Sequence, residues 1–222
     1  MIIPRTQRLL ERIYKVPGVY RALDFLVTDA RKAAQLEGES SAARDVPEKL
    51  LVEEDGQGAR LALYLDAAVL GRLEANDPHV ELSDHNLNDF WTVLEGISHF
   101  NYLTWRAAAG RAVSLLELEL QAEVDKFVCA ALLAARQRAG RVPRELHHYL
   151  FERHRLDPAL DDAGRERYRV ANRYAGKYCL RLAARFLHRH GPRGLIQEIR
   201  AFYRLGQREK IRHIDHGILA AT

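Results

Sequence analysis

The sequence predicts a mostly α-helical protein, a helical bundle with a small N-terminal portion that carries one β-hairpin. From residue 83 to the end, apolar residues recur with the period of an α-helix. Within residues 50–65 the apolar residues instead recur at every second position. Glycines separate two apolar runs there, which is typical of a hairpin. Residues 86–106 are apolar on most sides of a helix, which indicates a central, buried helix.

The N-terminal portion, residues 1–82, begins with predicted helices and then reaches the hairpin. Leu61, Leu63 and Leu65 alternate with smaller or polar-tipped residues, so one face of this strand should be apolar. A hairpin alone is marginally stable, and we therefore expect it to pack on the helices. The stretch 37–47 is polar and predicts a mobile loop. Helical segments are expected at residues 4–16, 19–27, 29–36 and 66–73.

The C-terminal portion, residues 83–222, should form the helical bundle and make one compact unit with residues 1–82. Ser114 and Glu117 have the spacing of a capping box, in which the hydroxyl and the carboxylate satisfy free N–H groups where a helix begins. The loop before this helix is short, so the helix should pair antiparallel with the central one. The predicted helices are 86–109, 114–138, 143–155, 165–188, 194–205 and 207–216.

A narrow polar stripe runs along the central helix, and it is the first candidate for a functional site. Glu95 and His99 are four residues apart and share a helical face. Counting outward from the loop sets His99 level with Glu123 on the next helix, and Tyr102 level with Gln121. That next helix carries two polar rows between its apolar lines. The stripe and the two rows are Asn88-Glu95-His99-Tyr102-Arg106, Glu117-Gln121-Asp125 and Glu119-Glu123-Lys126.

Carboxylates and an imidazole that converge from two helices suit either a metal ion or acid–base catalysis. Two further interpretations stay open: a buried structural network of hydrogen bonds, or a row that faces solvent and forms ordinary ion pairs. The sequence has no HExxH motif and does not identify a cofactor. The candidate metal ligands are Glu95, His99, Glu119 and Glu123, and the candidate catalytic residues are Glu95, His99 and Glu123.

Charge is distributed unevenly along the chain, whose formal net charge is +4. Residues 136–222 hold 20 Lys and Arg against 9 Asp and Glu, a net charge of +11, whereas residues 1–135 have a net charge of −7. This asymmetry suits an acidic partner, either a protein or a nucleic acid. The alternative is that the two halves neutralise each other within one fold.

The predicted helix 165–188 is the expected contact for that partner. Aromatic rings lie between its positive charges, a pattern that single-stranded nucleic acids can bind. We expect Arg169 and Arg173 on the outside, and Arg181 and Arg185 facing buried acids of the neighbouring bundle helix. The candidate binding residues are Tyr168, Arg169, Asn172, Arg173, Lys177 and Arg181.

The cysteines and the hydropathy pattern indicate the cellular compartment in which the protein is expected to work. Cys129 and Cys179 form no CxxC pair, which favours a reducing compartment. We expect no secretory signal and no transmembrane segment, because charges interrupt the apolar runs. The leading hypothesis is a cytoplasmic interaction or regulatory protein whose basic C-terminal half contacts an acidic partner. The alternative is a helical enzyme with a carboxylate and histidine site between the helices 86–109 and 114–138.

Overall fold

The computed structural model describes residues 1–37, 46–54, 59–152, 160–187 and 193–219. This part of the chain is mainly helical with a small mixed sheet, which confirms the mostly α class. The helices are α1 (Ile2–Tyr14), α2 (Ala30–Glu37), α3 (Ala67–Ala75), α4 (Leu87–Ala108), α5 (Leu115–Gln137), α6 (Leu146–Phe151), α7 (Asp162–Leu182), α8 (Arg193–Arg204) and α9 (Gln207–Leu219). The strands are β1 (Leu26–Val27), β2 (Glu48–Glu54) and β3 (Ala59–Leu65), with a 3₁₀ turn at Ala22–Phe25 and a π-helical turn at Ala183–Leu187.

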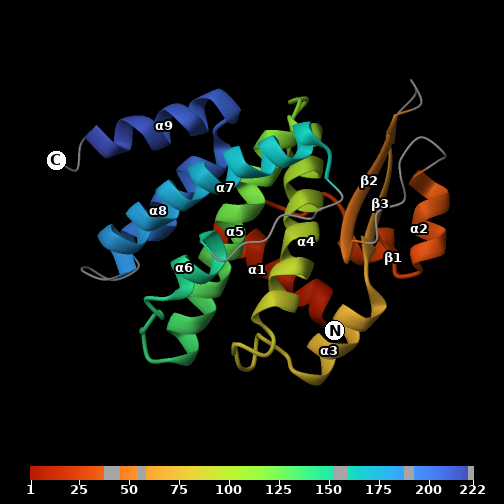
Figure 1. Ribbon diagram of the computed structural model, residues 1–222, viewed down its shortest axis with the longest axis horizontal. Coiled ribbons are helices and arrows are strands. Elements are labelled where there is room, and N and C mark those ends of the chain that lie inside the picture. Colours follow the sequence, from red (N-terminus) through yellow and green to blue (C-terminus); the bar gives the residue numbers. More distant parts are fainter. Residues whose placement is uncertain (38–45, 55–58, 153–159, 188–192, 220–222) are drawn as a thin grey trace.

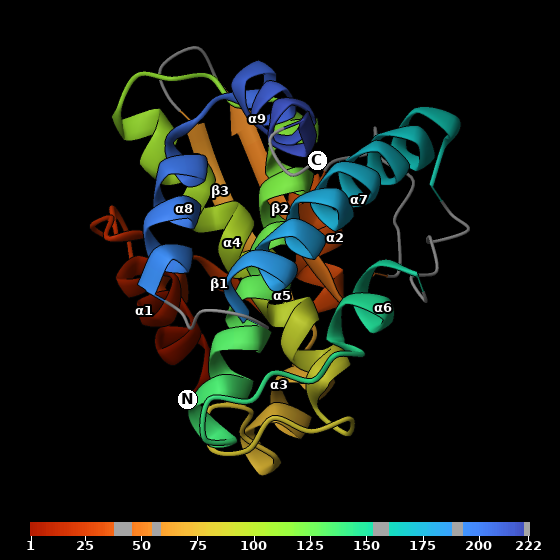
Figure 2. The same cartoon turned by 90° about the vertical axis from the view of Figure 1, so that its left-hand side faces the viewer.

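The elements form layers around α4 and α5 (Figure 1). The sheet packs on one side of α4, α5 packs on another, and α7 covers the far side of α5. Figure 2 shows α7 crossing in front of α5, with α8 and α9 beside it and α1 below. One hydrophobic core extends through these layers from Ile2 to Ile214. None of the described helices is long and apolar enough to cross a bilayer.

The sheet contains the predicted hairpin and one strand that was not predicted. β2 and β3 pair antiparallel, starting with Glu48 opposite Leu65. β1 adds a third strand, parallel to β3, with Leu26 opposite Leu63. The predicted helical segment 19–27 is therefore wrong, because its described structure is a 3₁₀ turn followed by a strand. A strand of two residues is too short to show an alternation of apolar and polar residues in the sequence. Its pairing depends on the free edge that β3 offers in the folded protein.

The strand β3 presents different side chains to its two faces, as the alternation predicts. Leu63 and Leu65 are buried in the main core against α4. Tyr64 points to the other face, where it forms a smaller cluster with Val27 of β1 and Ala33 of α2. The sheet is therefore held between α4 on one face and α2 on the other.

The helix α5 is buried nearly all round because it lies between α4 and α7. Ser114 caps its first turn, and its hydroxyl oxygen accepts a hydrogen bond from the backbone N–H of Glu117 at 3.1 Å. The Glu117 carboxylate does not complete the predicted capping box. It accepts hydrogen bonds from the Tyr102 hydroxyl at 2.6 Å and from the backbone N–H of Gln207 at 3.1 Å. The Tyr102 hydroxyl is buried, so it needs a protein acceptor more than the exposed first turn of the helix does.

The C-terminal helices follow the predicted order with different ends. α6 begins at Leu146, inside the predicted helix 143–155, and α7 gives way to a π-helical turn after Leu182. Asp161 caps α7 by accepting a hydrogen bond from the backbone N–H of Gly164 at 2.8 Å. Most of the predicted mobile loop lies outside the described residues, so the structure does not test it.

Two arginines of α8 hold it against the C-terminal end of α1. Arg200 Nε donates to the carbonyl of Ile13 at 2.7 Å, and an Nη atom of Arg204 donates to the carbonyl of Tyr14 at 3.3 Å. The last carbonyls of a helix have no donor within the helix, so these arginines satisfy them. The contact ties α8 to the N-terminal helix, which itself packs on α4 and α5.

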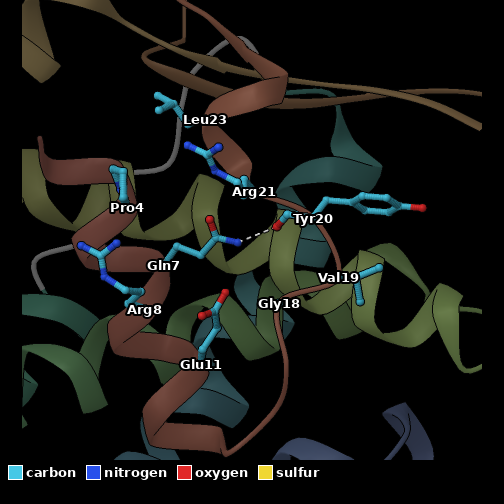
Figure 3. Close-up of a pocket in the computed structure, with 9 residues that line it drawn as sticks. All are labelled: Pro4, Gln7, Arg8, Glu11, Gly18, Val19, Tyr20, Arg21 and Leu23. Atoms are coloured by element: carbon cyan, nitrogen blue, oxygen red, sulfur yellow. Dashed lines mark hydrogen bonds between the residues drawn. The ribbon is translucent and has the colours of Figure 1, made fainter.

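A surface cavity of about 360 Å³ lies between α1 and the segment that follows it (Figure 3). Gln7 lies in its wall, where Nε2 donates to the carbonyl of Tyr20 at 2.8 Å and Oε1 accepts from the backbone N–H of Ala22 at 3.0 Å. The Glu11 carboxylate fills the space in which any side chain at Gly18 would lie. The polar groups of this wall therefore hold the loop in place, and none of the predicted site residues lines the cavity.

Candidate functional site

The polar stripe of α4 is mostly buried. Asn88 at its start is exposed and Glu95 is half-buried, whereas His99, Tyr102 and Arg106 are buried. Both polar rows of α5 are buried as well, because α4 covers one side of this helix and α7 covers the other. The interpretation in which one row faces solvent is therefore wrong.

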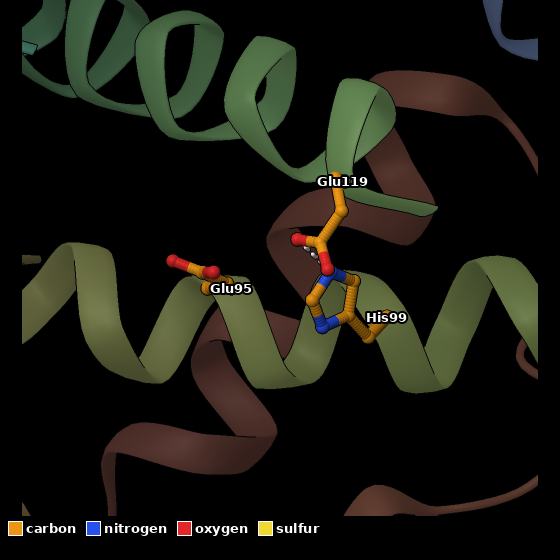
Figure 4. Close-up of side chains that lie close together, drawn as sticks. All are labelled: Glu95, His99 and Glu119. Carbon is orange, nitrogen blue, oxygen red and sulfur yellow. Dashed lines mark ion pairs between the residues drawn. The ribbon is translucent and has the colours of Figure 1, made fainter. Parts of the chain in front are cut away.

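His99 lies between two carboxylates that come from different elements. Its Nε2 atom is 3.5 Å from Glu119 Oε2 on α5, and its Nδ1 atom is 3.7 Å from Glu48 Oε1 at the start of β2. Figure 4 shows Glu119 reaching from α5 to the imidazole, with Glu95 one turn earlier on α4. The predicted level pairing of His99 with Glu123 is therefore wrong by one helical turn.

Lys126 pairs with the remaining carboxylates. Its ammonium group donates to Glu123 Oε1 at 2.7 Å and to Glu95 Oε2 at 2.9 Å. On the α7 side, Arg167 Nε is 3.8 Å from Glu119 Oε1. We refer to these seven side chains together as the carboxylate–histidine cluster: Glu48, Glu95, His99, Glu119, Glu123, Lys126 and Arg167.

Three members of the cluster are positioned as ligands of one metal ion would be. Glu95, His99 and Glu119 each offer one ligand atom, and these atoms all lie within 4.8 Å of one another. Several buried atoms around them have no hydrogen-bond partner in the described part of the chain, among them His99 Nε2, Glu48 Oε2 and Glu123 Oε2. Buried polar atoms are normally paired, so these atoms indicate a place where a further group would bind.

Sequence reasoning missed Glu48, the carboxylate that comes from the hairpin. It lies 47 residues before Glu95 in the chain, at a strand position where an acidic residue usually faces water. One signal was present in Gly96, an isolated glycine within an otherwise apolar helix. A Cβ atom at this position would lie 2.5 Å from Glu48 Oε2 and 3.0 Å from Leu63 Cδ1. The glycine therefore makes room for the carboxylate and for the sheet.

Burial and close charges shift the pKa values of the cluster. Burial alone would lower the pKa of His99, but the carboxylates of Glu119 and Glu48 raise it well above its usual value. Burial raises the pKa of Glu48 and of Glu123, and nearby cations oppose this rise only in part. Lys126 has its pKa raised by its carboxylate partners although burial opposes them. The cluster without a bound cation therefore tends to retain protons.

A second buried network lies along the other polar row of α5. Lys210 of α9 is fully buried, and its ammonium group contacts Gln121 Oε1 at 2.6 Å and the Tyr102 hydroxyl at 2.9 Å. Burial lowers the pKa of Lys210 to about 7, although Glu117 and Asp125 oppose the decrease. No sequence pattern marks this lysine as buried, because a charge within an amphipathic helix usually faces solvent.

The predicted binding residues of α7 lie partly on the surface. Arg169 and Arg173 are exposed, as predicted, and so is Lys177. The guanidinium of Arg173 and the ammonium of Lys177 lie 5.2 Å and 5.5 Å from the centre of the Tyr174 ring. Tyr168 as a whole residue is half-buried. Its hydroxyl group lies deeper in the protein, and burial raises the pKa of this group well above the usual value. Asn172 is likewise half-buried, so the exposed part of the set consists of the three cations.

Arg181 and Arg185 do not reach the buried acids of α5, so that expectation is wrong. Arg181 donates to the carbonyls of His213 and Ile214 at 3.3 Å and 3.4 Å, and Arg185 is exposed. The α7 arginine beside Glu119 is Arg167 instead. The crossing of α7 over α5 decides which turn meets the cluster, and the helical period alone does not contain this information.

Part of the positive charge of the C-terminal half stabilises the fold itself. Arg136 donates to the carbonyl of His79 at 2.8 Å, and Arg138 donates to the carbonyl of Leu82 at 3.2 Å. Arg181, Arg200 and Arg204 also bind backbone carbonyls. The charge asymmetry is therefore not in itself a measure of a partner surface.

Comparison with known proteins leaves the cluster without a described counterpart. No protein-family model, no curated protein and no solved structure matches this chain. Function is therefore inferred from the geometry and the charges of the site.

Proposed function

We propose that this protein binds one divalent metal ion in the carboxylate–histidine cluster, with Glu95, His99 and Glu119 as ligands. The observation that carries the proposal is the convergence of three ligand atoms within 4.8 Å of one another between α4 and α5. Ligand atoms about 2.0–2.3 Å from a metal ion lie roughly 3–4 Å from one another. Small rotations of the side chains would therefore bring the three groups into contact with one ion.

Glu48 orients the histidine ligand in this proposal. Its carboxylate lies on the other side of the imidazole, and its Oε2 atom is buried without a hydrogen-bond partner in the described chain. Because a histidine ligand binds the metal through one ring nitrogen, the other nitrogen needs a carboxylate or carbonyl to fix the tautomer. Glu48 suits this role through its Oε1 atom, which lies 3.7 Å from His99 Nδ1.

The buried charges support an ion of charge +2. The cluster holds four carboxylates and two permanent cations, Lys126 and Arg167. With a neutral His99, two negative charges remain in excess. Uncompensated buried charge is strongly unfavourable, and a divalent cation balances this excess. Two carboxylates and one imidazole favour Mn²⁺, Fe²⁺ or Zn²⁺ over a soft, thiolate-binding ion.

The proposal covers ion binding and includes no reaction. Two surface cavities in the described part of the chain are lined by α1 and its neighbours, and neither of these two is lined by a cluster residue. The acid–base role predicted for Glu95, His99 and Glu123 would need a substrate next to the imidazole. It therefore stays a hypothesis that metal binding neither requires nor excludes.

The test is the metal content of the purified protein after treatment with chelator and equilibrium dialysis against Mn²⁺. The native chain should retain one ion, and His99→Gln and Glu119→Gln should each bind at least tenfold more weakly. His79→Gln is the matched control, because His79 is also buried and pairs with Thr6 away from the cluster. Absence of binding by the native chain with Mn²⁺, Fe²⁺ and Zn²⁺ would refute the proposal, and so would equal binding by His99→Gln.

The exposed cations of α7 support a second candidate function, the binding of a polyanion. Arg169, Arg173 and Lys177 point outward at successive turns, and the last two lie against Tyr174. Phosphates and bases of a single-stranded nucleic acid fit cations that alternate with an aromatic ring. This candidate follows the leading hypothesis from the sequence, and it commits to nucleic acid as the partner.

The test is the affinity for a single-stranded oligonucleotide as a function of salt concentration. Affinity should fall steeply with salt, because phosphate contacts release counterions. Charge reversal at Arg169 and Arg173 should weaken binding, whereas reversal at the exposed Arg208 and Arg212 of α9 should not. Equal weakening by both pairs would indicate a non-specific charge effect, and no binding at low salt would remove the candidate.

A further inference from the structure

We infer that the cluster has two cation positions and that the ammonium group of Lys126 permanently fills one of them. The inference rests on the proposed function, because it concerns how many metal ions the same site accepts. Lys126 is 4% exposed, and its ammonium group lies between the carboxylates of Glu95 and Glu123 at 2.9 Å and 2.7 Å. Glu95 thus faces this ammonium and also belongs to the proposed metal site.

The surroundings of the ammonium group contain the ligands of a cation site. Glu123 Oε1 and Glu95 Oε2 already contact the positive charge, and Glu123 Oε2 is buried without a hydrogen-bond partner in the described chain. Two carboxylate oxygens from two helices therefore hold one positive charge, and the second oxygen of Glu123 is available as a further ligand. A carboxylate shared between two cations is the arrangement by which two-metal sites hold their ions about 3.5–4 Å apart.

The lysine limits the site to one metal ion. Lys126 and Arg167 together offset two of the four carboxylates, so two negative charges remain for the ion at His99. The ammonium group also occupies the point at which the second ion would lie. Removing this ammonium should take one cation away from Glu95 and Glu123, and a second divalent ion would replace it.

The experiment measures metal stoichiometry and the Mn²⁺ electron paramagnetic resonance spectrum of full-length Lys126→Met. The native chain should bind one Mn²⁺ and give the spectrum of an isolated ion. Lys126→Met should bind two Mn²⁺ and give the broadened spectrum of two coupled ions. Adding Glu123→Gln to this variant should return the stoichiometry to one, because it removes a ligand of the second position only.

Lys210→Met is the matched control, because it also removes a fully buried lysine but leaves the cluster unchanged. It should bind one ion, as the native chain does. Lys126→Gln, which keeps a hydrogen-bond donor between the two carboxylates, repeats the measurement if the methionine variant does not fold. Refolding of either variant that requires Mn²⁺, at two ions per chain, also supports the inference.

The outcomes separate this inference from the proposed function. One ion in the native chain and one in Lys126→Met would overturn the second position while leaving the metal site intact. No ion in the native chain and one in Lys126→Met would refute the proposed function and support a cation position at the lysine. No ion in either protein would refute both.

Discussion

Replacing Lys210 with methionine should remove a rise in stability between about pH 7 and about pH 10. The lysine is fully buried, and burial lowers its pKa from 10.5 to about 7. In the folded protein it is therefore largely neutral above pH 7, whereas in the unfolded chain it stays protonated to about pH 10.5. Folding then releases a proton over this range, and stability increases as pH rises.

The magnitude follows from the two pKa values. A separation of about 3.5 between them corresponds to about 5 kcal/mol over the full range, at about 1.4 kcal/mol for each tenfold change. Between pH 7 and pH 9 the expected increase is about 2 kcal/mol, because at pH 7 about half of the folded molecules have already lost the proton. Urea midpoints should shift by about 1 M, since the slope for a small protein is about 1–3 kcal/mol per molar urea.

The assay is a urea titration of the native chain and of Lys210→Met at about pH 7, 8 and 9. At each pH we compare the free energy of unfolding of the two proteins. The effects of the other titrating groups cancel in this difference. Absolute stability is a poorer measure, because methionine also leaves Gln121 Oε1 without its lysine donor. Lys177→Met is the control, since Lys177 is exposed and lies on α7, outside the buried network of Lys210.

The reasoning would be refuted if native and Lys210→Met differed in free energy of unfolding by an amount that stays constant, within about 0.5 kcal/mol, from pH 7 to pH 9. A constant difference would mean that Lys210 keeps its proton in the fold. Glu117 and Asp125, which oppose the effect of burial, would then outweigh it.

Four further predictions concern the core, an exposed glycine and the cluster. Trp91→Ala should cost about 3–5 kcal/mol in urea titrations, because Trp91 is 8% exposed within the core. Gly96→Ala should cost about 1–3 kcal/mol, because its Cβ would lie 2.5 Å from a carboxylate oxygen. Gly71→Ala, with nothing within 4 Å, should instead stabilise its helix by up to about 1 kcal/mol. In chelator, His99 contributes stability below pH 6.5 that is lost as pH rises through its raised pKa. The difference in melting temperature between native and His99→Gln should therefore shrink from about pH 5.5 to about pH 9, and a difference that grows would contradict the assignment.

The sequence alone determined which side chains lie on the same face of a helix or strand. The alternation at Leu61, Leu63 and Leu65 predicted the hairpin and its buried face. The four-residue spacing of Glu95 and His99 placed both on one side of a helix that is indeed central. These features are local, because side-chain direction within a helix or strand follows from the backbone period.

The tertiary structure decided which faces meet and at what height. Helix packing set His99 against Glu119 and not against Glu123, one turn away, because the offset between two helices depends on how their ridges interlock. The sheet brought Glu48 to the same imidazole, and α9 brought Lys210 into the core. No local pattern encodes these contacts between segments far apart in the chain. They arise from the packing of many apolar side chains, which together fix the register of elements whose periods alone leave it undetermined.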